Sequence, residues 1–124
     1  MNISVIEFFI KNIYPEEFKD KRILEVGSKY VNGSVRPLIE KFLMPKEYIG
    51  ADIEEGKFVD VILDAENLVN YFGREVFDVI ISTELLEHVL NWRNVINNMK
   101  GVLKPGGYIY YNQIKGFSLS CLSL

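Results

Sequence analysis

A chain of 124 residues, of which 48% are hydrophobic, is long enough to bury one modest core, and we expect a single domain over residues 1–124. The formal net charge of -3, without a Lys/Arg cluster on any expected helix face, argues against a basic nucleic-acid-binding surface. The single cysteine, Cys121, cannot form an internal disulfide, which favours a reducing, cytoplasmic compartment.

Residues 1–14 are expected to form an amphipathic helix that packs on the domain. Ser4 and Glu7 have the spacing of a capping box at its start. The apolar stretch is interrupted by Glu7 and Lys11, and it lacks a basic leader and a cleavage site. It is therefore too short and too charged to be a membrane span or a signal peptide.

Apolar, strand-like runs then alternate with helical patterns. The expected strands are Arg22–Gly27, Tyr48–Asp52, Val59–Leu63, Phe77–Ser82 and Tyr108–Asn112. Strands separated by helices indicate βαβ units with right-handed crossovers. The sequence therefore predicts an α/β fold: a doubly wound, mainly parallel, Rossmann-like sheet of about five strands.

Two helices and one turn are expected between these strands. The first helix spans Ser34–Leu43, and the second is capped by Asn91 and runs to about Val102. Lys104–Gly107 (KPGG) reads as a turn. One face of the second helix is expected to be buried: Val95, Ile96, Met99 and Val102.

Ligands of such sheets bind outside the carboxyl ends of the strands. Gly27 ends the first strand, where a glycine permits a tight turn and close approach of a ligand, although a plain turn glycine explains it equally well. The dinucleotide fingerprint G-x-G-x-x-G is not met, because Lys29 stands two positions on and the next glycine is Gly33. This loop argues against NAD or FAD.

Two aspartates follow the next two strands. Asp52 can accept from both hydroxyls of a ribose, or it is an ordinary turn aspartate with no structural partner. Asp64 can accept from the exocyclic amine of an adenine, or it caps a short helix that begins near Glu66. Both alternatives stay open for each residue.

Five segments in order resemble the class I S-adenosylmethionine-dependent methyltransferase family: ILEVGS, YIGADI, VDVILDAENL, FDVIISTELLEHV and VLKPGGYIYY. The resemblance covers roughly residues 20–113. Any one of these segments is only weakly specific for the family, whereas five of them in the usual order are strongly specific for it. The resemblance implies S-adenosylmethionine as the cofactor.

The resemblance also implies roles for individual residues. Glu25 would fix the loop around the methionine amino group, and Gly27 would lie against the methionine and ribose part. Ser28, the next residue, would also belong to the cofactor site. Asp52 would hold the ribose hydroxyls and Ile53 would pack on the adenine. Asp64 and the Ala65 amide would contact the adenine edge. Ser82 and Thr83 would line the cofactor near its sulfonium.

The chain departs from the family pattern in two places. Lys29 stands where a second glycine is common. The usual C-terminal strands are missing, and residues 117–124 form a tail that does not resemble the family. We therefore expect a truncated member whose fifth strand has an exposed edge, covered by the alternating residues Phe117–Cys121 of its own chain or of a second copy in a homodimer.

A Glu-x-x-Glu-His cluster follows the fourth strand. Glu84 and His88 are weak candidates for a general base, whereas methyl transfer from a sulfonium needs little more than alignment of the nucleophile. With only one histidine in the chain, we expect no metal site.

Two functional hypotheses stay open. The first is a methyltransferase of unknown acceptor whose substrate site needs a partner to be complete. The second is a non-catalytic binding module that keeps the fold. No membrane association is expected under either.

Overall fold

The computed structural model describes residues 7, 11, 13–31, 33–82, 89–112 and 119–123. In chain order the elements are η1 (Pro15–Glu17), β1 (Arg22–Val26), α2 (Arg36–Leu38), the π-helix η2 (Ile39–Leu43), β2 (Glu47–Asp52), β3 (Val61–Ile62), η3 (Ala65–Asn67), α3 (Leu68–Phe72), β4 (Phe77–Ser82), α4 (Trp92–Val102), β5 (Leu103–Asn112) and β6 (Leu119–Ser123). Most of the expected N-terminal helix, with Ser4 of its capping box, lies outside the described residues, although Glu7 and Lys11 are helical.

The strands form one sheet in the order β3-β2-β1-β4-β5-β6. Strands β1 to β5 pair in parallel, as the alternation of strands and helices predicts. The order reverses after β1, because β2 and β4 lie on its two sides. This reversal is the switch point beside which doubly wound sheets bind ligands.

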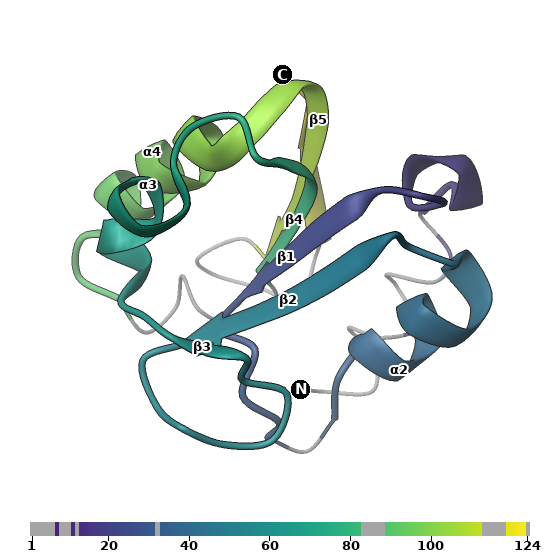
Figure 1. Ribbon diagram of the computed structural model, residues 1–124, viewed down its shortest axis with the longest axis horizontal. Coiled ribbons are helices and arrows are strands. Elements are labelled where there is room, and N and C mark those ends of the chain that lie inside the picture. Colours follow the sequence, from purple (N-terminus) through teal and green to yellow (C-terminus); the bar gives the residue numbers. More distant parts are fainter. Residues whose placement is uncertain are drawn as a thin grey trace.

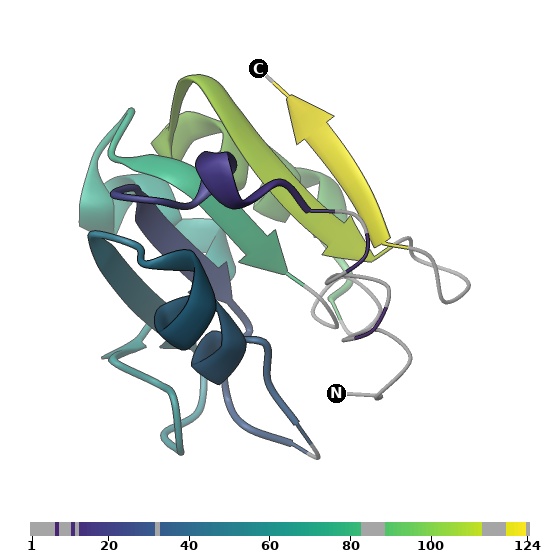
Figure 2. The same cartoon turned by 90° about the vertical axis from the view of Figure 1, so that its right-hand side faces the viewer.

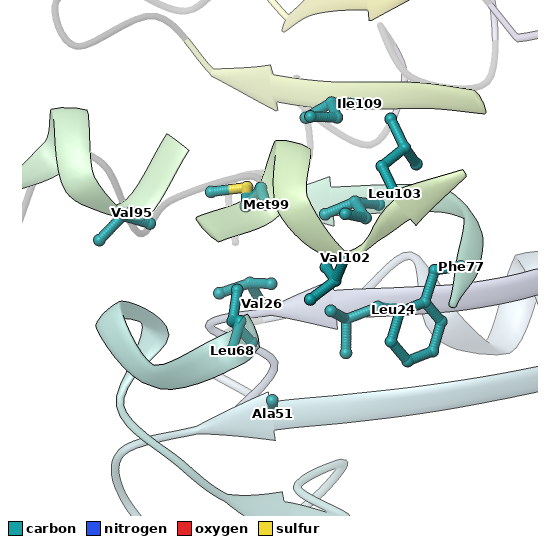
Figure 3. Packing of buried hydrophobic residues seen from close by; sticks show 11 residues of the cluster. Leu24, Val26, Ala51, Leu68, Phe77, Val95, Met99, Val102, Leu103 and Ile109 are labelled. Carbon is teal, nitrogen blue, oxygen red and sulfur yellow. The ribbon is translucent and has the colours of Figure 1, made fainter. Parts of the chain in front are cut away.

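Helical segments cover both faces of the sheet (Figure 1). On one face α3 and α4 pack over the larger cluster of buried side chains, shown in Figure 3: Leu24, Val26, Ala51, Leu68, Phe77, Ile80, Val95, Met99, Val102, Leu103 and Ile109. On the other face the segments around η1, α2 and η2 cover Phe18, Ile23, Val35, Ile39, Tyr48, Val79, Ile81 and Tyr110. The doubly wound fold is therefore confirmed, as is the buried face of α4.

Four local expectations differ from the structure. Helix α2 begins at Arg36 and continues as a π-helix, and β3 has only two residues. Asn91 makes no side-chain capping hydrogen bond to α4. The turn expected at 104–107 lies inside β5, where the register shifts between the pairs Phe77↔Leu103 and Val79↔Tyr108. Gly106, with φ of 83°, gives that segment its turn-like backbone within the strand.

The tail supplies the sixth strand. β6 pairs antiparallel with β5, with Tyr110 opposite Cys121, and Figure 2 shows it lying along that strand. The expectation that the tail covers the β5 edge in its own chain is therefore confirmed for residues 119–121, and the strand continues to Ser123. Phe117 lies outside the described residues. A homodimer stays a prediction.

Candidate functional site

A cavity of about 310 Å³ lies at the carboxyl ends of β1, β2 and β3. Five of the residues expected to bind the cofactor line it: Gly27, Asp52, Ile53, Asp64 and Ala65. Val26, Ala51 and Val95, labelled in Figure 3, line it from the core. The five expected residues that the structure brings together here lie up to 38 positions apart in the sequence.

The first strand turns sharply at Gly27. Its φ is 77°, a left-handed conformation that side chains with a Cβ rarely adopt. The Gly27 and Ser28 amides both donate to the Ala51 carbonyl oxygen, at 2.8 and 3.1 Å. The turn therefore holds the loop after β1 against the end of β2.

Asp52 has structural partners that the sequence did not predict. Its Oδ2 accepts from the Lys29 amide at 2.9 Å, and its Oδ1 accepts from the Glu54 amide at 3.0 Å. The expectation that Asp52 lacks a structural partner is wrong, because the fold brings Lys29 beside it from 23 positions away. A carboxylate has about four acceptor positions, so it can bind ligand hydroxyls at the same time.

Lys29, in place of a second glycine, points away from the cavity lining. Its Nζ lies 2.8 Å from Glu54 Oε2, and its carbon chain lies 2.9 Å from where a Cβ on Gly56 would be. This hydrogen bond raises the pKa of Lys29 and lowers that of Glu54. Because both groups are solvated, the pair contributes little to stability. The bulky residue is accommodated without filling the site.

Asp64 caps a short helix and also lines the cavity. Its Oδ1 accepts from the Glu66 amide at 2.9 Å and so caps η3. It also lines the cavity, and its Oδ2 has no hydrogen-bond partner among the described residues. One oxygen therefore fixes the side chain and the other is available to a ligand.

Three polar side chains at the ends of β1 and β4 are buried: Glu25, Ser28 and Ser82, each at most 2% exposed. Within the described residues, the Oγ atoms of Ser28 and Ser82 have no hydrogen-bond partner. A buried hydroxyl without a partner costs about 1–3 kcal/mol, so both positions suit a polar ligand atom. Neither serine lines the cavity.

Glu25 accepts a hydrogen bond from the Tyr48 hydroxyl, with 2.6 Å between the oxygens. Burial raises the pKa of Glu25 to about 7, against the opposing effects of the Tyr48 hydrogen bond and of Arg36. Glu25 itself does not line the cavity, whereas the next two residues, Val26 and Gly27, do. A buried carboxyl whose pKa is raised toward neutral pH, so close to a cavity, is typical of functional sites.

Sequence reasoning missed several residues of the cavity. Leu90 is 98% exposed and Ile53 66% exposed, so two apolar side chains stand at the site in contact with solvent. Asn91, expected as a helix cap, donates from Nδ2 to Glu66 Oε1 at 3.3 Å. The missed residues follow β3 or stand between β4 and α4, and this position at the ligand-binding edge was the signal that could have identified them. Besides the core residues Val26, Ala51 and Val95, the missed lining residues are Leu63, Glu66, Val89, Leu90 and Asn91.

The remaining expected residues cannot be placed. Thr83, Glu84, Glu87 and His88 lie outside the described residues. Across the ranges that the structure describes, no three His, Cys, Asp or Glu side chains are grouped as metal ligands, and no helix is long and apolar enough to cross a membrane.

Two curated relatives and a solved structure resemble the chain. It is 36% identical over 58 residues to the mitochondrial ubiquinone biosynthesis O-methyltransferase of Dictyostelium discoideum, covering 47% of this chain and 18% of that protein. It is 28% identical to the phthiotriol/phenolphthiotriol dimycocerosates methyltransferase 1 of Mycobacterium ulcerans, covering 80% and 40%. The crystal structure of an S-adenosylmethionine-dependent methyltransferase from Mesorhizobium loti has a TM-score of 0.61 at 19% identity, covering 77% and 47%.

The chain spans less than half the length of each of these proteins. The family model described as "Methyltransferase domain" matches residues 4–118, nearly the whole chain. The chain therefore belongs to the class I S-adenosylmethionine-dependent methyltransferase family.

Proposed function

We propose that this domain binds S-adenosylmethionine in the cavity at the ends of β1, β2 and β3 and takes part in methyl transfer to an acceptor still to be identified. The observation that carries the proposal is the pair Asp52 and Asp64, which line one cavity together with the apolar Ile53. Two carboxylates and an apolar surface match a ribose, an exocyclic amine and a flat base.

The residues at the site fit the cofactor. Asp52 would accept from the ribose hydroxyls and Asp64 Oδ2 from the adenine amine, while Ile53 would pack against the ring. The Ala65 amide would donate to a ring nitrogen. Glu25 would accept from the methionine ammonium, and Gly27 would let this part approach the backbone.

The unpartnered Oγ atoms of Ser28 and Ser82 support the same placement, because the cofactor would offer them polar atoms. Ser82, together with Thr83, would lie near the sulfonium. When bound, the cofactor supplies a methyl group on a positively charged sulfur. The chain's own task would then be to hold and align it, since alignment supplies much of the rate in such reactions. Glu84 and His88 remain the candidates for a general base.

The acceptor site is proposed to need a partner, either another protein or a second copy of this chain. The support is that a methyltransferase of similar fold from Haloferax volcanii was solved in complex with the Trm112 methyltransferase activator. The cytoplasm is the proposed compartment, because one cysteine cannot form an internal disulfide.

The alternative is a non-catalytic binding module that keeps the cavity. Methyl transfer assays with cofactor and candidate acceptors separate it from an enzyme, because a module binds the cofactor without turnover. Calorimetric titration with S-adenosylmethionine, S-adenosylhomocysteine and NADH tests the cofactor itself. Binding of the first two and not of NADH supports the proposal, and heat from NADH alone would replace it with a dinucleotide site.

A further inference from the structure

Arg36 of α2 joins three parts of the fold beside the proposed site. Its guanidinium donates to Asp60 Oδ2 at 2.7 Å and to Glu40 Oε1 at 3.0 Å. It also lies over the rings of Tyr48 and Phe58, 4.9 and 5.6 Å from their centroids. With its side chain only 14% exposed, Arg36 fixes α2 against β2 and against the loop that follows β2.

Tyr48 connects this cluster to Glu25. Its ring is held under Arg36, and its hydroxyl donates to Glu25 Oε1 at 2.6 Å. Glu25 is 2% exposed, and this is the one hydrogen bond of its side chain within the described part of the chain. The position of the Glu25 carboxyl thus depends on one described donor, the Tyr48 hydroxyl, and Arg36 fixes the ring of that tyrosine.

Arg36 also supports the loop after β2, which begins next to Asp52. Asp60 Oδ2 accepts from both Arg36 and the Gly50 amide, the latter at 2.8 Å, and the Asp60 amide donates back to the Gly50 carbonyl at 2.9 Å. Although burial acts in the opposite direction, these hydrogen bonds keep the pKa of Asp60 below its usual value. The ionised Asp60 carboxylate therefore anchors this loop to Arg36.

Three charged or titratable groups face Glu25 from the described elements packed around it: Tyr48 and Asp52 from β2 and Arg36 from α2. Burial raises the pKa of Glu25 to about 7, the Tyr48 hydrogen bond and the Arg36 charge favour its ionised form, and Asp52 disfavours it. Near neutral pH, the carboxyl is therefore divided between its neutral and ionised forms.

We propose that Arg36 and Tyr48 are positioning residues of the cofactor site, which hold the Glu25 carboxyl two residues before Gly27 and favour its ionised form for a ligand that carries an ammonium group. This inference rests on the proposed function. It makes cofactor binding a proton-linked event, because an ammonium paired with Glu25 displaces the proton that burial keeps on the carboxyl.

The test is calorimetric titration of the full chain with S-adenosylhomocysteine from pH 6 to pH 8.5, in buffers of different ionisation enthalpy. For the wild type we expect affinity about tenfold higher at pH 8 than at pH 6, because only about one Glu25 in eleven is ionised at pH 6 when its pKa is about 7. We also expect nearly one proton released per ligand at pH 6 and almost none at pH 8.5.

Tyr48→Phe keeps the ring under Arg36 and removes only the hydroxyl. We expect the pH at which binding strengthens to move upward, so that affinity falls severalfold at pH 7 and largely recovers at pH 8.5. Arg36→Met should also move this pH upward, because the positive charge that favours ionised Glu25 is lost. Arg36→Lys keeps a positive charge and should show a smaller upward shift. Glu25→Gln should remove both the pH dependence and the proton release. Tyr71→Phe, at a tyrosine that is 58% exposed, is the matched control and should leave both unchanged.

The outcomes separate the two proposals. If the wild type does not bind S-adenosylhomocysteine at all, the proposed function fails. If it binds without proton release, or if Tyr48→Phe weakens binding equally at every pH, the positioning roles are overturned while the cofactor assignment stands. Should Arg36→Met not fold, Tyr48→Phe and Glu25→Gln decide the question.

Discussion

The Asp52 Oδ2 atom accepts a hydrogen bond from the Lys29 amide at 2.9 Å, so the carboxylate that ends β2 also holds the loop that follows β1. Its other oxygen holds the start of the next loop through the Glu54 amide. A residue proposed to bind the ribose therefore also organises two loops beside the cavity. Substitutions at this position should change stability as well as affinity.

Asp52→Ala is expected to weaken S-adenosylhomocysteine binding by about 2–3 kcal/mol, roughly 30- to 150-fold, because two hydrogen bonds to a charged acceptor are lost. It should also lower the free energy of unfolding by about 1–2 kcal/mol, since two backbone amides lose their acceptor. Asp52→Asn keeps one acceptor oxygen and should have smaller effects on both. Calorimetry and urea denaturation measure the two quantities.

Glu55→Ala is the matched control, because it removes an exposed carboxylate from the same loop. Neither affinity nor stability should change with it. Unchanged affinity for Asp52→Ala would remove the ribose role of this residue.

Gly50 is a structural requirement that the sequence pattern YIGAD did not reveal. A Cβ at this position would lie 2.0 Å from the Phe58 carbonyl oxygen and 2.6 Å from Ser28 Oγ. Because a backbone atom cannot move aside cheaply, we expect Gly50→Ala to destabilise the protein by about 3 kcal/mol. Gly106→Ala meets nothing within 4 Å and bears only the strain of its φ of 83°, so it should lose about 1–2 kcal/mol. Equal losses in chemical denaturation would contradict the close approach at Gly50.

Gly27→Val combines two effects. The residue lines the cavity, and its φ of 77° is unfavourable for a β-branched side chain. We expect binding to be abolished and also a stability loss of at least about 1–2 kcal/mol. The melting temperature of the variant measures the second effect, and a melting point equal to that of the wild type would count against the left-handed turn.

The ligand-free protein should show the titration of Glu25 in its stability. The pKa of Glu25 is raised from 4.5 to about 7, so the folded state holds a proton that the unfolded state releases between these values. The protonated Glu25 carboxyl therefore contributes about 3 kcal/mol to the free energy of unfolding at low pH. This contribution is fully present below pH 4.5 and is lost as the pH rises through 7. Glu25→Gln removes this contribution. The test is the difference in unfolding free energy between wild type and variant, measured from pH 5 to pH 8. We expect this difference to change by nearly the full amount of about 3 kcal/mol over that range, in favour of the variant. A difference that stays constant with pH would contradict the raised pKa of Glu25.

Lys29→Ala should have little effect on cofactor affinity, within about twofold, although Lys29 stands where the family commonly has glycine. The contact with Asp52 is made by the backbone amide, which alanine keeps, and the side chain pairs with Glu54 in solvent. A large gain in affinity would show that the lysine side chain obstructs the site.

The parts of the fold that sequence predicted are those that follow from local periodicity. The apolar runs at β1, β2 and β4 and the stripe of Val95, Met99 and Val102 on α4 are patterns within one element, and each was found. Even the tail strand β6 followed from alternation of apolar and polar residues at an edge that needed covering.

What could not be predicted depends on contacts between distant residues. The partners of Asp52, the role of Asp60 as a bridge between Arg36 and Gly50, and the approach of Phe58 to Gly50 all involve loops folded back on the sheet. Asn91 was expected to cap α4 from its own position, yet the tertiary structure gives it a partner in Glu66, 25 positions away. Local propensity carries no information on such pairs.

The most direct test of the cofactor assignment is a calorimetric titration of the wild-type chain with S-adenosylmethionine and S-adenosylhomocysteine, with NADH as the comparison ligand. We expect saturable binding of the first two at one site and no heat from NADH. Absence of heat and of a thermal shift with both sulfur ligands at millimolar concentration would contradict the account.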